Sequence, residues 1–140
     1  MIMLFNEAFD ELIHSEGGYT EDTQDSGNWT SGIIGKGELK STKFGISAAS
    51  YPHLDIKSLT LSDAKLIYKR DYWDVWDRLP GMSNAFPDSL LYELFDAAVN
   101  TGMPNAKRFL QRSVGVADDG LIGPVTIAAL DSALTAHGIA

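Results

Sequence analysis

The chain has 140 residues, the length of one ordinary domain, and folding such a chain buries roughly two thirds of the surface that it exposes when unfolded. Its composition, 44% hydrophobic and 21% charged, is typical of a soluble globular protein without stable membrane insertion. A net charge of −8 argues against nucleic acid as the main partner, and the absence of cysteine excludes disulfides, thiolate metal sites and a cysteine nucleophile.

The N-terminal residues 1–7 lack the basic start and the sustained apolar core of a signal peptide. We therefore expect the protein to stay in the cytoplasm until another factor releases it. The next segment, residues 6–15, predicts an amphipathic helix, because apolar residues recur there at three- and four-residue intervals. These residues are Phe5, Ala8, Phe9, Leu12 and Ile13.

Glu16 continues the apolar face of this helix, because it follows Leu12 by four residues and Ile13 by three. A carboxylate at the edge of a packed interior is desolvated, and the glycines at 17 and 18 place it at the negative end of the helix dipole. Both effects predict a raised pKa, which suits a general acid. Alternatively, the Glu16 carboxylate caps a buried hydrogen-bond network or reaches solvent.

A polar, glycine-rich stretch over residues 17–41 predicts a long loop or small hairpin, with room for a short hairpin around residues 29–34. Loops of this length in a compact domain are usually functional. The segment that follows, residues 42–47, closes this region as a strand or as the entry to another helix. Asp25 lies among hydrogen-bond donors in the loop, and we expect it to remain ionised. Its alternative role is that of a turn residue bonding its own backbone.

The remainder of the chain predicts helices. Thr60 and Asp63 have the spacing of a capping box, Pro87 is suited to the first position of a helix, and Gly102 is suited to a helix end. The expected helices cover residues 61–77, 87–100, 104–114 and 124–136. Aromatic residues crowd the first of these helices and are expected mainly in the core, namely Tyr68, Tyr72, Trp73 and Trp76. Helices therefore dominate the predicted fold.

Two carboxylates in different surroundings predict glycosidic chemistry. Cleavage of a glycosidic bond needs an acid that protonates the leaving oxygen and, in the usual schemes, a second carboxylate that acts as base or nucleophile. Glu16 and Asp25 supply such a pair, since their surroundings should separate their pKa values. Tyr19 and Trp29 lie in the same loop and are candidates to stack on sugar rings, although anchoring of the loop explains an aromatic residue there equally well.

Metal and cofactor chemistry find no support in the sequence. The three histidines, His14, His53 and His137, lack the spacing of zinc ligands. No phosphate-binding loop, dinucleotide fingerprint or calcium loop is present either. The sequence therefore calls for no metal and no cofactor.

Several motifs, in the right order and over nearly the whole chain, resemble those of glycoside hydrolase family 108. This family comprises phage and prophage N-acetylmuramidases once called secretion activators. The motifs are Glu16-Gly17-Gly18-Tyr19, Asp25 with Gly27, residues 42–47, Tyr68 with Tyr72-Trp73, residues 95–102, and the stretch from Gln111 to Thr126.

This resemblance implies a lysozyme-like single domain, mainly α, with about five to seven helices over residues 1–140. An N-terminal catalytic lobe would cover about 1–85, and a helical segment similar to predicted peptidoglycan-binding segments about 86–140. The implied reaction is hydrolysis of the β-1,4 bond between N-acetylmuramic acid and N-acetylglucosamine. Glu16 would be the essential acid, Asp25 the base that positions water, and Thr42 the hydroxyl partner of Asp25. We expect the anomeric configuration to be inverted.

Two features qualify these roles. Residues 28–41 separate Gly27 from Thr42, whereas many members of the family place the threonine only a few residues after the aspartate loop. Glu38, inside this insertion, is a rival carboxylate, ranked below Asp25 because pairing with nearby lysines in solvent is its expected use. Asn100 is expected either to hydrogen-bond the glycan or to cap the end of its own helix.

The alternatives are a lytic transglycosylase, which can work with one glutamate, and a non-catalytic peptidoglycan-binding or secretion-assisting module. The expected partner is bacterial peptidoglycan, and the expected state is a monomer. By resemblance the protein is an endolysin, made in the host cytoplasm and acting on the cell wall after export through a holin or another route.

Overall fold

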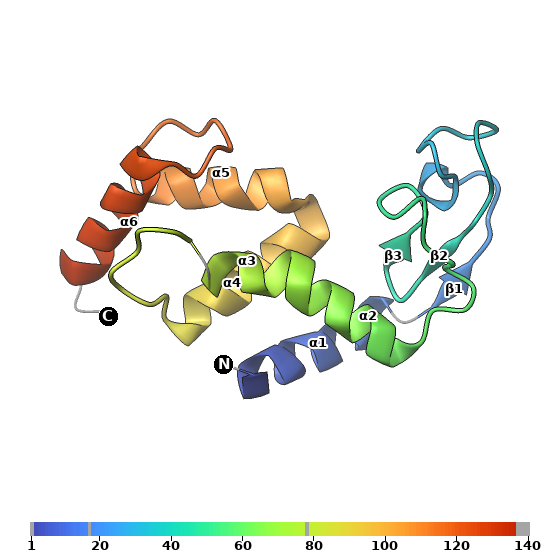
Figure 1. The fold of residues 1–140 in the computed structure, drawn as a ribbon, viewed down its shortest axis with the longest axis horizontal. Helices are drawn as coiled ribbons and strands as arrows, with labels where there is room; N and C mark the ends of the chain where they lie inside the picture. The colour runs from blue at the N-terminus through green and yellow to red at the C-terminus, as the bar shows by residue number, and fades with distance from the viewer. Residues whose placement is uncertain (1, 17, 78, 137–140) are drawn as a thin grey trace. The chain divides into compact units, whose positions relative to one another are not determined.

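The computed structural model describes residues 2–16, 18–77 and 79–136. It confirms a mainly α, lysozyme-like fold with a small sheet (Figure 1). The α-helices are α1 (Ile2–Glu16), α2 (Leu61–Tyr68), α3 (Asp74–Asp77), α4 (Asp88–Thr101), α5 (Met103–Ser113) and α6 (Pro124–Ala136). Within the described residues, no helix combines the length and apolar character needed to cross a bilayer.

The chain divides into two compact units. The sheet unit comprises Asn6–Ile67, and the helical unit comprises Met1–Phe5 with Tyr68–Ala140. The chain passes between them within α1 and again at the end of α2. Tyr19, Asp25 and Thr42 therefore belong to the sheet unit, and Asn100 belongs to the helical unit.

The sheet unit contains three two-residue strands, β1 (Tyr19–Thr20), β2 (Thr42–Lys43) and β3 (Ile46–Ser47). They form an antiparallel sheet in the order β1-β2-β3, with Thr42 opposite both Thr20 and Ser47. Phe44 and Gly45 join β2 to β3 with positive φ angles of 53° and 77°, the backbone geometry of a tight hairpin turn. The sequence left open whether residues 42–47 form a strand or the entry to a helix, and the structure shows two strands, β2 and β3.

The short hairpin expected around residues 29–34 is wrong in its position. Trp29 pairs instead with Leu39 through an isolated antiparallel bridge, and the residues between them form turns. Thr30 secures this arrangement from both sides, because its N–H donates to the Glu38 carbonyl (2.9 Å) and its Oγ1 accepts from the Glu38 N–H (3.0 Å). We call residues 28–41 the insertion loop.

The core of the sheet unit is apolar and includes side chains from α1, β3 and α2. Its buried members are Ala8, Phe9, Ile46, Ala48, Ile56, Leu59, Ala64 and Ile67. At the start of α2, the Asp63 N–H donates to Thr60 Oγ1 and the Thr60 N–H to Asp63 Oδ2, each at 3.1 Å. This is the capping box expected from the sequence, and these bonds hold the pKa of the Asp63 carboxyl below its usual value.

The helix expected over residues 61–77 is present but contains a π-helical turn, Lys69–Trp73, between α2 and α3. The expected core role of its aromatic residues is confirmed for Tyr68, Trp73 and Trp76, which are buried. The Trp73 ring lies edge-on to Phe5 at 5.5 Å and to Phe95 at 5.4 Å between centroids. These contacts join three separate segments of the helical unit.

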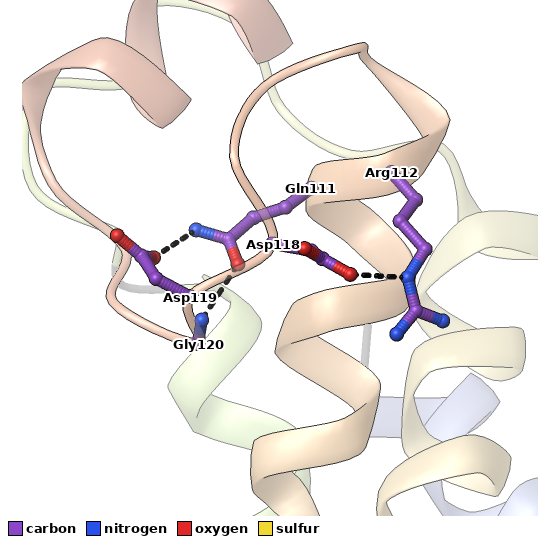
Figure 2. A network of polar contacts seen from close by, with 5 residues as sticks. All are labelled: Gln111, Arg112, Asp118, Asp119 and Gly120. Carbon is purple, nitrogen blue, oxygen red and sulfur yellow. Dashed lines mark hydrogen bonds and ion pairs between the residues drawn. The ribbon is translucent and has the colours of Figure 1, made fainter.

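The helix ends of the helical unit follow the glycine and proline positions in the sequence. Pro87 is the N-cap of α4 rather than its first residue, and Gly102, with φ of 94°, ends α4 and precedes α5. After α5, the buried Gln111 holds the loop that leads to α6 (Figure 2). Its Oε1 accepts from the Gly120 N–H at 2.8 Å, and its Nε2 donates to Asp119 Oδ1 at 3.0 Å.

Candidate functional site

Glu16 is the last residue of α1, as the glycines that follow it suggested. Its side chain lies outside the part of the chain that the structure describes, and so does Gly17. The role of Glu16 as general acid therefore stays a prediction.

Asp25 begins a short 3-10 turn, Ser26–Asn28, as its N-cap. Its Oδ1 accepts a hydrogen bond from the Gly27 N–H at 2.9 Å, and the residue is exposed. This is the turn role that the sequence offered as the alternative for Asp25. Because the carboxylate is exposed and held by a backbone donor, it keeps a fixed position while its remaining lone pairs stay open to water. The geometry is therefore compatible with a base that orients a water molecule.

Thr42, in β2, donates its hydroxyl hydrogen to Oδ1 of Asn28 at 2.6 Å. The described partner of Thr42 is therefore Asn28, whereas the sequence suggested Asp25. Asn28 is completely buried, and its Nδ2 donates to the Asp22 carbonyl at 2.9 Å. The Asn28 carbonyl also accepts from the N–H groups of Lys40 (2.9 Å) and Ser41 (3.0 Å).

Asn28 is the residue that the sequence analysis missed. It ties the turn that carries Asp25 to the strand that carries Thr42, because the Asn28 N–H donates to the Asp25 carbonyl at 3.1 Å. An asparagine after a glycine in a polar loop looks like an ordinary turn residue. One feature of the sequence could have identified Asn28 as a structural residue, namely its position at the start of the insertion, directly after the motif of Asp25 and Gly27.

Tyr19 and Trp29, the two candidates for sugar stacking, differ in their surroundings. Trp29 is half-buried, and its Nε1 donates to the Thr23 carbonyl at 3.1 Å, so it anchors the loop as the alternative expectation stated. Tyr19 is 40% exposed, its hydroxyl donates to Glu21, and the Lys43 ammonium lies 5.9 Å from its ring centroid. Tyr19 is therefore the better placed of the two to meet a ligand.

A pocket of about 430 Å³ opens beside Tyr19 within the sheet unit. Its volume falls in the range of small-molecule sites. We call it the Tyr19 pocket, and it is lined by Tyr19, Glu21, Leu39, Lys40, His53, Asp55, Ile56 and Lys57. Two of these residues, Leu39 and Lys40, belong to the insertion loop, so this loop builds part of the wall.

No described contact joins the other candidate residues to Asp25, Asn28 and Thr42 or to the Tyr19 pocket. Asn100 is exposed, and its Nδ2 donates to Asp96 Oδ1 at 3.0 Å, one turn earlier in α4. Glu38 is exposed in the insertion loop, and no ion pair links it to a described lysine. His14 lies in the last turn of α1, and His137 lies outside the described residues. Among the residues described, no cluster of His, Asp or Glu could hold a metal ion.

Comparison with known proteins gives a family match and a structural match. The model of the family described as glycosyl hydrolase 108 matches residues 9–102, a range that includes Glu16, Asp25 and Thr42. A solved structure of Brucella abortus SagA is 27% identical, with a TM-score of 0.64, and the match covers 94% of this chain and 71% of that one. The search of curated proteins found no match.

The family match covers more than half of the chain and contains the segment in which the structure joins Asp25, Asn28 and Thr42. The resemblance noted in the sequence is thereby confirmed over residues 9–102, and the likeness of the C-terminal segment to peptidoglycan-binding segments stays a prediction. The chain belongs to the glycosyl hydrolase 108 family.

Proposed function

We propose that the chain is an N-acetylmuramidase that hydrolyses the β-1,4 bond between N-acetylmuramic acid and N-acetylglucosamine in bacterial peptidoglycan. Glu16 protonates the leaving oxygen, and Asp25 activates a water molecule on the opposite face of the sugar. The observation that carries this proposal is the family match over residues 9–102, which includes both carboxylates.

The geometry of the sheet unit supports the assignment of Asp25. Its carboxylate is exposed and fixed by the Gly27 N–H, while the buried Asn28 holds the same turn against β2. Such fixed positioning is what water activation requires. An inverting enzyme needs a separation of roughly 6.5 to 9.5 Å between its two carboxyl groups, whereas a retaining enzyme needs roughly 5 to 5.5 Å.

Product analysis on purified peptidoglycan tests the reaction. A muramidase releases new reducing ends at muramic acid, without anhydro sugars. Anhydro-muropeptides in the mass spectrum would instead identify a lytic transglycosylase. No turnover at all would identify a non-catalytic binding or secretion-assisting module. Proton NMR of the first product formed distinguishes inversion from retention.

The Glu16→Gln variant tests the role of the acid, and Glu11→Gln is its matched control because Glu11 is exposed on the same helix. General acid catalysis typically contributes a factor of about 100 to 10,000. We therefore expect Glu16→Gln to lose at least about 100-fold in kcat, and Glu11→Gln to keep the parental rate. Full activity of Glu16→Gln would remove Glu16 from the chemistry.

We also propose that this muramidase acts as an endolysin. It is made in the host cytoplasm and reaches the wall after release through a holin or a comparable route. The segment of about residues 86–140 contributes contacts to peptidoglycan, and the protein acts as a monomer. Expression in cells with and without a holin tests the route, because lysis should depend on the holin.

A further inference from the structure

We propose that the Tyr19 pocket binds the peptide stem of peptidoglycan through groups of both charges, a carboxylate and an ammonium. This inference rests on the proposed function, since it concerns the same substrate. It assigns a second recognition site within the sheet unit, directed at the peptide rather than at the sugar chain.

The walls of the pocket are fixed by two lysines that reach across the unit. Lys40 Nζ donates to the Pro52 carbonyl at 2.9 Å, and Lys43 Nζ donates to the Lys57 carbonyl at 2.9 Å. The insertion loop and β2 are thereby tied to the segment that carries His53, Asp55 and Lys57. Because the walls are already held in place, little conformational entropy is lost when a ligand binds in the pocket.

The charged groups on the rim are available to a ligand. Among the residues that the structure describes, no ion pair or hydrogen bond engages the side chains of His53, Asp55 or Lys57. Glu21 accepts one hydrogen bond, from the Tyr19 hydroxyl, and its carboxylate has further acceptor capacity. The rim thus presents two carboxylates, Glu21 and Asp55, together with the Lys57 ammonium.

Three lining residues add apolar surface beside these charges. Ile56 is buried, Leu39 is 38% exposed, and the hydroxyl of the exposed Tyr19 donates to Glu21. A lining that combines apolar side chains with charges of both signs matches a short peptide with small aliphatic side chains and charged groups of both signs. A neutral sugar would leave the carboxylates and the ammonium without charged partners.

Peptidoglycan supplies such a peptide. Its stems carry free carboxylates, and their diamino acid carries an ammonium group. In the proposed complex a stem carboxylate faces Lys57, and the diamino acid ammonium faces Asp55 and Glu21. Charge pairs at exposed sites contribute modestly to affinity, so the effect belongs to substrate choice more than to the chemical step.

A binding experiment tests the inference without requiring catalysis. The probe is the sugar-free tripeptide L-alanyl-γ-D-glutamyl-meso-diaminopimelate, titrated into the full chain and followed by NMR. We expect shifts at Tyr19, Asp55 and Lys57, and weaker binding by about two- to fivefold in Lys57→Met and in Asp55→Asn. Lys36→Met is the matched control, because Lys36 is exposed in the insertion loop but does not line the pocket.

A modified ligand identifies the partner of each charge. Acetylation of the diaminopimelate amine should weaken binding to the parent protein and should have a smaller effect on Asp55→Asn, in which only Glu21 still faces the ammonium. If the tripeptide leaves the pocket signals unchanged, or if an N-acetylglucosamine oligomer shifts them in its place, the inference is overturned. Cleavage of wall by a protein that ignores the tripeptide would leave the muramidase proposal intact. Tripeptide binding by a protein that cleaves no glycan would remove only the muramidase proposal.

Discussion

At the scale of single residues, Asn28 connects the parts of the candidate site through its side chain and its main chain. It is buried, and its side chain satisfies both the Thr42 hydroxyl and the Asp22 carbonyl. Removing the Asn28 amide takes away the described acceptor of the Thr42 hydroxyl, whereas the Asp22 carbonyl keeps the Asp25 N–H. The loss of a buried hydrogen-bond partner costs about 1 to 3 kcal/mol. Asn28 therefore links the stability of the sheet unit to the placement of Asp25 and Thr42.

We expect Asn28→Ala to lower the free energy of unfolding by about 1 to 3 kcal/mol, measured by urea denaturation. Asn105→Ala is the control, because Asn105 also donates to a backbone carbonyl, that of Thr101 at 2.8 Å, but is exposed. The free energy of unfolding should fall less in Asn105→Ala than in Asn28→Ala. We further expect Asn28→Ala to lower kcat more than the affinity for substrate, since it removes the side-chain bond that holds the turn of Asp25 against Thr42 in β2. Equal losses in both variants would contradict this role of Asn28.

Asp131 provides a prediction on pH dependence. Its carboxylate in α6 accepts from the N–H groups of Ser83 (2.8 Å) and Asn84 (2.9 Å), and these bonds hold its pKa below the usual value. A lowered pKa in the folded state means that the ionised form stabilises the fold above the unfolded pKa of about 3.9. This contribution is lost as the pH falls through the folded pKa.

Asp131→Asn should therefore lower the Tm at pH 7, and the difference from the parent protein should shrink as the pH falls below about 4. Thermal unfolding followed by circular dichroism across this range measures the effect. Glu93→Gln is the control, since Glu93 is an exposed residue of α4 in the same unit. A difference that stays constant with pH would show that charge at Asp131 plays no part.

At the scale of elements, the insertion loop has a defined conformation rather than being a loose connection. Gly35 and Gly37 both adopt positive φ, 80° and 81°. A Cβ added at Gly35 would meet nothing within 4 Å, whereas at Gly37 it would lie 2.6 Å from Thr30 Oγ1. That oxygen accepts from the Glu38 N–H and so holds the two sides of the loop together.

The two glycines form a matched pair for substitution. Gly35→Ala should cost only the backbone penalty of about 1 to 2 kcal/mol for an L-residue with positive φ. Gly37→Ala should cost about 1 to 3 kcal/mol more, because the new methyl group displaces Thr30. Chemical denaturation measures both losses. If the two variants were equally stable, the close approach at Gly37 would have no energetic weight.

The connection between α5 and α6 depends on a single buried amide. Gln111 donates to Asp119, to the Leu121 carbonyl and to Thr126 Oγ1, and accepts from the Gly120 N–H. Gln111→Leu keeps the approximate size of the side chain but removes all four of these hydrogen bonds, of which Figure 2 shows those to Asp119 and Gly120.

We expect Gln111→Leu to destabilise the protein by at least about 2 kcal/mol, and to increase amide hydrogen exchange over residues 118–123. Arg112→Leu is the neighbouring control, because the ion pair of Arg112 with Asp118 (2.6 Å) is exposed. Exposed pairs of this kind contribute little to stability, because water and ions screen them. Unchanged exchange in Gln111→Leu would contradict the anchoring role of the amide.

The sequence predicted those elements whose signals are local. The capping box of Thr60 and Asp63 and the glycine at 102 mark helix ends with neighbouring residues alone. The π-helical turn was not predictable in this way, because Trp73 packs on Phe5 and Phe95, which are remote in sequence. The small sheet is likewise non-local, since Thr20 pairs with Thr42 across the insertion loop.

For the candidate site, the motifs identified residues but not the contacts between segments that are distant in the sequence. The identities of Glu16, Asp25 and Thr42 came from the motifs, and the family match includes all three. The bond from Thr42 to Asn28 could not be foreseen, because it depends on how the insertion loop folds back on the aspartate turn. The Tyr19 pocket is non-local for the same reason, with a wall drawn from three segments of the sheet unit.

At the scale of the whole molecule, net charge bears on the encounter with the proposed substrate, the cell wall. A charge of −8 should repel a cell wall that carries peptide carboxylates and anionic polymers. Added salt screens this repulsion over a Debye length of about 8 Å at physiological ionic strength. We expect lysis of outer-membrane-permeabilised cells to accelerate between low salt and about 0.15 M, measured as turbidity loss. A steady decline in rate with added salt would indicate a basic binding face instead.

The three tryptophans give each compact unit its own optical signal. Trp73 and Trp76 are buried in the helical unit, and Trp76 Nε1 has no hydrogen-bond partner among the described residues. Trp29, in the sheet unit, is partly hydrated. Because indoles in dry surroundings emit at shorter wavelengths than hydrated ones, the blue edge of the fluorescence spectrum should follow melting of the helical unit. The red edge should follow events around the insertion loop, so the native chain can be studied without an attached dye.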